Sequence, residues 1–205
     1  MKKHKIIKSN NRIQPTQSHG KTVELRTERL ILRQWKQDDY APFAKMSADP
    51  VVMEYYPSTL SAEESNAMAD KIASLISERS WGFWAVELIE EKQFIGFVGL
   101  HKPTYELPVT HCVEIGWRLT KEYWGHGYAT EAAQASLQFA FEVLGLNEVY
   151  SFASVSNIKS CSVMKRLNMQ DTGNNFEHPM IPDNHPLREH VLYKITKKQW
   201  ENIAD

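Results

Sequence analysis

The stretch that decides the fold is Trp124-Gly125-His126-Gly127-Tyr128-Ala129-Thr130-Glu131-Ala132. An alternating apolar run at 113–119, typical of a strand, precedes it, and apolar residues recur at helical spacing from 129 to 144 after it. A turn with two glycines between a strand and a helix can hold a phosphate. Glycine lets the backbone approach a bulky anion, and the first helical N–H groups have no partner inside the helix. The stretch therefore predicts either an anion-binding turn or a plain strand-to-helix bend.

The spacing narrows the kind of phosphate site that this turn could form. A dinucleotide-binding turn would need a third glycine where Thr130 stands, and a P-loop would need Gly-Lys-Ser/Thr, which the sequence lacks. The remaining candidate is a pyrophosphate held only by backbone N–H groups, as in coenzyme A.

Charge divides the chain into a leader and a body. The chain has 205 residues and a net charge of −1, a length that suits one domain. Five cationic residues stand near the beginning of the chain, at Lys2, Lys3, Lys5, Lys8 and Arg12. We predict a flexible basic leader at 1–22 and a single domain at 23–205. The acidic body argues against a nucleic-acid-binding core, whereas the leader is either a solvated tail or a weak contact for RNA.

Neither a membrane span nor a metal site is expected. The sequence contains no run of about 18 apolar residues, and the leader lacks the apolar segment of a signal peptide. Cys112 and Cys161 match no metal-binding spacing and are expected to be buried free thiols. These features favour a cytoplasmic protein without a metal.

Periodicity and end signals give an order of elements. Strands are expected at 30–33, 81–88, 94–100, 113–119, 149–155 and 190–195, and helices at 38–49, 61–79, 129–144, 157–167 and 197–203. Ser61 and Glu64 have capping-box spacing, and Gly145 and Asn168 suit left-handed helix ends. Residues 176–187 are expected to form a loop. The order predicts one mixed sheet with helices on both faces.

Several stretches together resemble one family. They are Leu30-Ile31-Leu32-Arg33, Phe94-Ile95-Gly96, Val113-Glu114-Ile115-Gly116-Trp117, the glycine turn, Asn157-x-x-Ser160 and Met164-x-x-Leu167-Asn168-Met169. The combination resembles the GNAT N-acetyltransferases, specifically the RimJ/RimL-like branch. The resemblance implies an α+β fold with a mixed, mostly antiparallel central sheet, helices on both faces, and a splay between the strands at 113–119 and 149–155. It also implies acetyl-CoA as the co-substrate.

The resemblance also implies where the cofactor binds. Its pantetheine arm would follow the backbone of Trp117, Arg118 and Leu119, beside a bulge expected at Gly116. Its pyrophosphate would rest on the turn residues Gly125, His126, Gly127, Tyr128, Ala129 and Thr130. Asn157 and Ser160 would bond the cofactor, although Asn157 would equally suit the N-cap of the helix that follows.

Catalysis needs a proton acceptor and a donor to the thioester oxygen. Glu114 is the first candidate base, against the alternatives of a solvated carboxylate or one paired with Arg118. His178, His185 and His190 are weaker candidates. The backbone N–H of Trp117 is the candidate oxyanion donor. Many relatives carry a tyrosine as general acid where this chain has Met164, but a thiolate leaves readily enough to manage without one.

The sequence therefore predicts an N-acetyltransferase that moves the acetyl group of acetyl-CoA directly to a primary amine. The acceptor would be a small molecule or a protein N-terminus, without a membrane or nucleic-acid partner, and the protein would be a monomer or a homodimer. The alternative is a non-catalytic acyl-CoA sensor or interaction module, which the missing tyrosine motivates.

Overall fold

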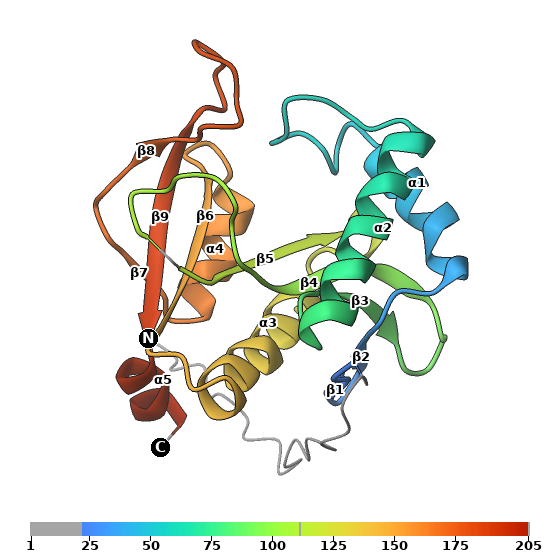
Figure 1. Ribbon diagram of the computed structural model, residues 1–205, viewed down its shortest axis with the longest axis horizontal. Helices are drawn as coiled ribbons and strands as arrows, with labels where there is room; N and C mark the ends of the chain where they lie inside the picture. The colour runs from blue at the N-terminus through green and yellow to red at the C-terminus, as the bar shows by residue number, and fades with distance from the viewer. Residues whose placement is uncertain (1–21, 111, 205) are drawn as a thin grey trace.

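A computed structural model describes residues 22–110 and 112–204, so the predicted leader lies almost wholly outside the described residues. The strands form one nine-stranded sheet in the order β1-β2-β3-β4-β5-β6-β9-β7, with β8 also pairing with β9 (Figure 1). Their bounds are β1 Leu25–Arg26, β2 Leu30–Arg33, β3 Phe83–Leu88, β4 Phe94–His101, β5 Glu114–Leu119, β6 Glu148–Ser154, β7 Gln170–Asp171, β8 Phe176–Glu177 and β9 Glu189–Thr196.

Helices occupy the connections between these strands. They are η1 Gln37–Asp39, α1 Tyr40–Ser47, α2 Ala62–Arg79, η2 Lys121–Tyr123, α3 Tyr128–Gln138, η3 Phe139–Val143, α4 Ile158–Arg166 and α5 Lys197–Ala204. All strand pairs are antiparallel except β5 with β6. The predicted mixed, mostly antiparallel sheet is therefore confirmed. No helix in the described ranges is long and apolar enough to cross a membrane.

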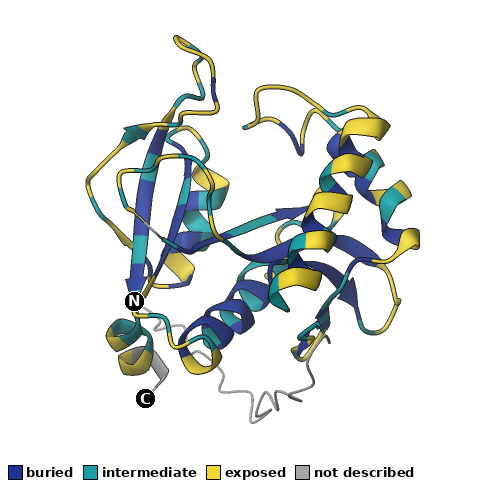
Figure 2. Cartoon of the chain, in the orientation of Figure 1, coloured by how far each residue is buried: buried dark blue, intermediate teal, exposed yellow. Residues whose placement is uncertain are grey.

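The core lies on both faces of the sheet. Side chains on a strand alternate between faces, so the adjacent Phe97 and Val98 of β4 point in opposite directions. Phe97 packs beside Phe43 of α1, with ring centroids 6.1 Å apart. Trp84, paired with Val98, packs instead against Phe139 after α3, at 5.5 Å. Figure 2 shows α3 largely buried, whereas the outer side of α2 is exposed.

Several local signals in the sequence act as expected. Ser61 Oγ accepts a hydrogen bond from the Glu64 N–H at 3.2 Å, and the Glu64 carboxylate accepts one from the Ser61 N–H at 2.8 Å. This is the predicted capping box at the start of α2. Asn168 and Gly145 take the predicted left-handed conformation, with φ of 58° and 66°.

Two expectations about the elements differ from the structure, the first only in the type of its last turn. The helix expected at 129–144 ends as an α-helix at Gln138 and continues as the π-helical turn η3. The segment expected to be a loop at 176–187 begins with β8, which pairs with the start of β9 through Phe176↔His190. A two-residue strand is too short to give a periodic signal.

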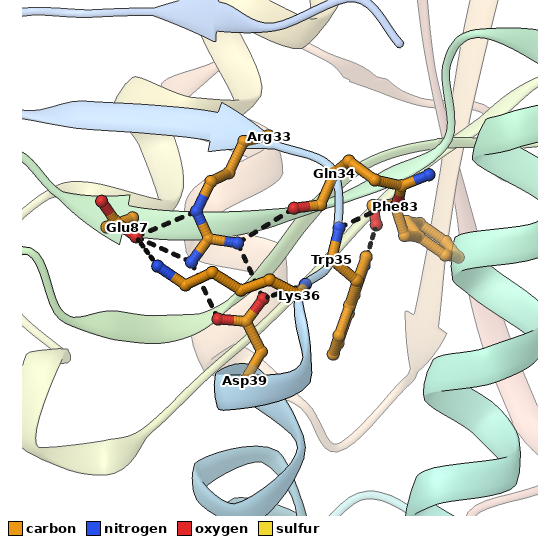
Figure 3. A network of polar contacts seen from close by, with 7 residues as sticks. All are labelled: Arg33, Gln34, Trp35, Lys36, Asp39, Phe83 and Glu87. Atoms are coloured by element: carbon orange, nitrogen blue, oxygen red, sulfur yellow. Dashed lines mark hydrogen bonds and ion pairs between the residues drawn. The ribbon is translucent and has the colours of Figure 1, made fainter.

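A buried ion network joins β2, η1 and β3 (Figure 3). The Arg33 guanidinium donates two hydrogen bonds to Asp39, at 2.7 and 2.8 Å, and also binds Glu87 at 2.7 Å. Lys36 Nζ reaches the same Glu87 oxygen at 2.9 Å. Burial by itself would raise the pKa of Glu87, but the hydrogen bonds from Lys36 and Arg33 hold that pKa below its ordinary value. The network fixes the chain where it leaves the sheet for α1.

Candidate active site

The sheet opens between β5 and β6. The two strands share one register pair, Glu114↔Tyr150, and the Tyr150 N–H donates to the Val113 carbonyl at 3.0 Å. The Ile115 carbonyl then accepts the buried Ser151 hydroxyl at 2.9 Å, so a side chain replaces the next rung of the ladder. Beyond this point β5 runs away from β6 (Figure 1). The splay predicted between the two central strands is therefore present.

The expected bulge at Gly116 is wrong. The pairing of β4 with β5 runs without a shift from Gly96↔Leu119 to His101↔Glu114, through Gly99↔Gly116. The opening thus arises because β6 turns away, while β5 stays regularly paired with β4.

Strand geometry decides which backbone groups of β5 face the opening. The N–H and C=O of one residue point to the same side of a strand, and the side alternates along the chain. Since Val113 and Ile115 bond toward β6, Trp117 also faces that side, now without a partner strand. Arg118 faces the other way, because a Cβ added to Gly96 of β4 would collide with the Arg118 carbonyl. The backbone of Arg118 was predicted to contact the cofactor. In the structure Arg118 instead presents its side chain to the opening.

A cavity of about 500 Å³ lies in this opening. All of the predicted cofactor-binding residues line it except His126, which is exposed and stacks on Tyr128. The lining consists of Val52, Tyr55, Tyr56, Trp117, Arg118, Leu119, Tyr123, Trp124, Gly125, Gly127, Tyr128, Ala129, Thr130, Asn157, Lys159, Ser160, Ser162, Val163 and Arg166.

The glycine turn presents backbone N–H groups to the cavity. Gly125 and Gly127 have φ of 80° and 83°, a region that side chains disfavour. The first helical bond of α3 runs from the Glu131 N–H to the Gly127 carbonyl. The amides of Tyr128, Ala129 and Thr130 therefore precede that ladder and suit an anion at the positive end of the helix dipole.

Thr27 and Arg29, which lie between β1 and β2, form a clamp that holds this turn. The Arg29 guanidinium pairs with Glu131 at 2.6 Å and donates to the His126 carbonyl at 3.1 Å. The Thr27 hydroxyl donates to the same carboxylate at 2.6 Å. The clamp compensates the negative charge of Glu131 in the first turn of α3, where it would otherwise oppose an anionic ligand.

The start of α4 forms another wall of the cavity, beside the glycine turn. Asn157 Oδ1 caps the helix by accepting from the Ser160 N–H at 3.0 Å, which leaves the amide NH₂ of Asn157 as its remaining donor. Among the residues that the structure describes, the lining includes three cations, Arg118, Lys159 and Arg166, and no carboxylate. Such a cavity favours a ligand with several negative charges.

Glu114 stands at the root of the opening and is not part of the cavity lining. It is 9% exposed, and burial raises the pKa of its carboxyl to about 8. It pairs across the strands with His101, whose pKa burial lowers to about 4. The two predicted alternatives for Glu114 do not fit, because the side chain is buried and forms no ion pair with Arg118 within the described residues.

The histidines form part of an aromatic cluster on the other side of the opening. His178 and His190 have ring centroids 4.9 Å apart, and His178 also lies 5.0 Å from Tyr105. Burial lowers the pKa of His178 to about 4 and also lowers that of His190. The half-buried His185 lies in the loop before β9, where its Nδ1 accepts the Leu187 N–H.

Met164 packs in the hydrophobic core with no exposed surface. It does not line the cavity, and the tyrosines that do come from other segments: Tyr55 and Tyr56 before α2, and Tyr123 and Tyr128 around the glycine turn. Sequence reasoning predicted Tyr128 as part of the turn but missed Tyr55, Tyr56 and Tyr123, and also Lys159, Arg166 and Arg29. Only the α4 cations carried a signal, since residues seven apart share a helix face.

Comparison with known proteins agrees with this geometry. Residues 29–170 match the acetyltransferase (GNAT) domain. The chain is 30% identical to the uncharacterized N-acetyltransferase YnaD of Bacillus subtilis, over 87% of this chain and 99% of that protein.

Solved structures share the fold. A GNAT-family acetyltransferase from Bacillus anthracis superposes with a TM-score of 0.72 at 26% identity, covering 85% of this chain and 99% of that one. A ribosomal-protein-S5-alanine acetyltransferase from Vibrio fischeri superposes with a TM-score of 0.68 at 18% identity, covering 87% and 98%.

Proposed function

The chain belongs to the GNAT acetyltransferases and is an acetyl-CoA-dependent N-acetyltransferase; we propose that it transfers the acetyl group directly to a primary amine with Glu114 as the proton acceptor. The observation that carries this proposal is the buried Glu114 carboxyl at the root of the β5–β6 opening, with its pKa raised to about 8. A base whose pKa lies near that of an ammonium group takes its proton efficiently.

The residues of the opening fit the parts of acetyl-CoA. The amides of the glycine turn and the cations Lys159 and Arg166 suit its phosphates, and the free edge of Trp117 suits the pantetheine arm. When bound, acetyl-CoA supplies an activated acyl group as a thioester.

Proton transfer and charge stabilisation divide between two residues of β5. Glu114 removes a proton from the ammonium form of the acceptor, which frees the nitrogen lone pair for attack on the acetyl carbon. The Trp117 N–H, which faces the opening, donates to the carbonyl oxygen as that oxygen gains charge. As the carbon–nitrogen bond forms, the carbon–sulfur bond would break, and the thiolate would leave and take up the second proton of the attacking nitrogen. Because a thiol has an ordinary pKa of about 8.5, Met164 in place of a tyrosine is compatible with turnover.

We propose two classes of acceptor, a small amine and a protein N-terminus. Similarity to the ribosomal-protein acetyltransferase at 18% identity shows a shared fold and does not choose between them. That the chain belongs to the RimJ/RimL-like branch is likewise a proposal.

The test is the pH dependence of acetyl transfer in a Glu114→Gln variant. In the wild type, kcat/KM should rise with pH around a midpoint near pH 8 and level off above it, because the ionised carboxylate is the active form. Glu114→Gln should lower the plateau about 10²- to 10⁴-fold and remove this step. Glu122→Gln, at an exposed carboxyl of η2, is the matched control. An unchanged profile in Glu114→Gln would refute its role as base. Acetyl-CoA binding without transfer to any amine would instead support the acyl-CoA sensor.

A further inference from the structure

Arg118 is a buried cation without a counter-charge. It is 7% exposed, and its Nε is buried without a hydrogen-bond partner. Its guanidinium lies 4.1 Å from the centroid of the Tyr56 ring and 5.3 Å from that of Phe97, and its Nη1 lies 4.0 Å from the Met68 sulfur. Within residues 22–110 and 112–204 it forms no ion pair with a carboxylate.

Arg33 has the carboxylate partners that Arg118 lacks among the described residues. Arg33 is similarly enclosed and binds both Asp39 and Glu87 (Figure 3). An arginine cannot shed its charge in a protein, so a buried one is ordinarily paired. Aromatic faces compensate part of the cost of burial, but the Nε of Arg118 has no acceptor and its Nη1 reaches only the weakly accepting Met68 sulfur.

Arg118 lies on the same strand as Glu114, the proposed proton acceptor, and on the same face of the sheet. Every second residue of a strand shares a face, so Glu114, Gly116 and Arg118 lie on the face that carries Phe97 and α1. Gly116 lies between the two on this face and is covered by the Phe83 ring, which lies 3.2 Å from where a Cβ at Gly116 would stand. The Cα atoms of Glu114 and Arg118 are about 13 Å apart along the strand.

The other two cations of the cavity occupy a different wall. Lys159 and Arg166 belong to α4, and Lys159 lies over the Trp124 ring beside the glycine turn. Arg118 instead contacts α2 and the segment before it, through Met68 and Tyr56. Its charge is therefore separate from the proposed phosphate site.

On the premise of the proposed function, we infer that Arg118 binds a carboxylate on the acceptor, so that the preferred substrate is a small amine that also carries a carboxylate. The amine lies toward Glu114 and the carboxylate accepts hydrogen bonds from the guanidinium of Arg118. The anion thus supplies the counter-charge that the described residues do not provide, and Arg118 determines specificity.

Matched acceptor pairs test this inference. We would measure kcat and KM for ω-amino acids with one to five carbons between the amine and the carboxylate, beside their primary amides. Phosphoethanolamine and ethanolamine form the phosphate arm. The carboxylate member should be favoured at least tenfold in kcat/KM, mainly through KM. Arg118→Met should reduce this ratio to near one, and Arg118→Lys should retain part of it.

Controls separate the possible failures. The acetyl-CoA dissociation constant of Arg118→Met should stay within about twofold of wild type, and thermal unfolding checks its fold. Lys159→Met should weaken acetyl-CoA binding and keep the carboxylate preference. Pairs with equal kcat/KM, turnover restricted to amines without a carboxylate, or a phosphate preference would overturn the inference while leaving acetyl transfer intact. Absence of transfer to every amine would instead refute the proposed function. Loss of acetyl-CoA affinity in a folded Arg118→Met would assign the guanidinium to the cofactor.

Discussion

The glycine turn allows a test with an internal control. Gly127 and Gly145 both have positive φ, 83° and 66°, so Gly127→Glu and Gly145→Glu should each cost about 1–2 kcal/mol of stability from backbone strain. Gly127 lines the cavity at the start of α3. Gly145 follows η3 at the other end, about 25 Å away at 1.5 Å per residue.

The two variants should differ in cofactor affinity. At an effective dielectric constant of about 20, a carboxylate about 6 Å from one phosphate charge is repelled by about 3 kcal/mol, a roughly 100-fold loss. Arg29, whose Nη2 would lie 3.5 Å from the new Cβ, is already paired with Glu131 and offsets little of this. The charge in Gly145→Glu lies beyond the screening length of about 8 Å, so affinity should be unchanged.

Calorimetric titration with acetyl-CoA measures both dissociation constants, with thermal unfolding as the stability control. Gly127→Gln separates bulk from charge and should lose less affinity than Gly127→Glu, whose loss should also diminish as salt is added. Equal dissociation constants for Gly127→Glu and Gly145→Glu, in two folded proteins, would refute the phosphate-binding role of the turn.

Three further predictions concern stability. The pKa of Glu114 is about 8 in the folded state and about 4.3 in the unfolded state, so between these pH values only the folded state holds the proton. Wild-type stability should therefore fall as pH rises through this range and then level off. The urea-unfolding free energy of Glu114→Gln should lack this slope, and parallel slopes in the two proteins would contradict the buried carboxyl. Arg33→Met leaves Asp39 and Glu87 without their shared partner and should cost about 3–5 kcal/mol, against little for Arg79→Met, whose contact with Glu78 spans 3.9 Å. Ser151→Ala removes the buried bond to Ile115 and should cost about 1–3 kcal/mol by the same assay. Ser162→Ala removes a solvent-exposed hydrogen bond to the Ile158 carbonyl and should cost less.

What could be predicted from the sequence were features that depend on near neighbours. The glycine turn follows from steric rules that act over a few residues, as do the Ser61 capping box and the left-handed Asn168. The strand pattern at 113–119 likewise placed Glu114 on the face opposite the apolar residues of the strand, which is why its candidacy could be stated before the structure was known.

What could not be predicted depends on contacts between distant segments. Arg29 reaches Glu131 across 102 positions of the chain, and neither residue belongs to a motif that names the other. The free edge of Trp117 follows from the departure of β6, and the unpaired charge of Arg118 follows from which side chains enclose it. The pKa of Glu114 is set by burial, which local periodicity does not reveal.

Mass spectrometry of the reaction with isotope-labelled acetyl-CoA tests the central claim most directly. The protein is incubated with the labelled donor and a panel of primary amines, and free thiol, acetylated amine and intact protein are quantified together. Direct transfer predicts one acetylated amine for each coenzyme A thiol released, with no label on the protein and strong loss of product in Glu114→Gln. Thiol release without an acetylated amine, or label passing through the protein itself, would contradict the account.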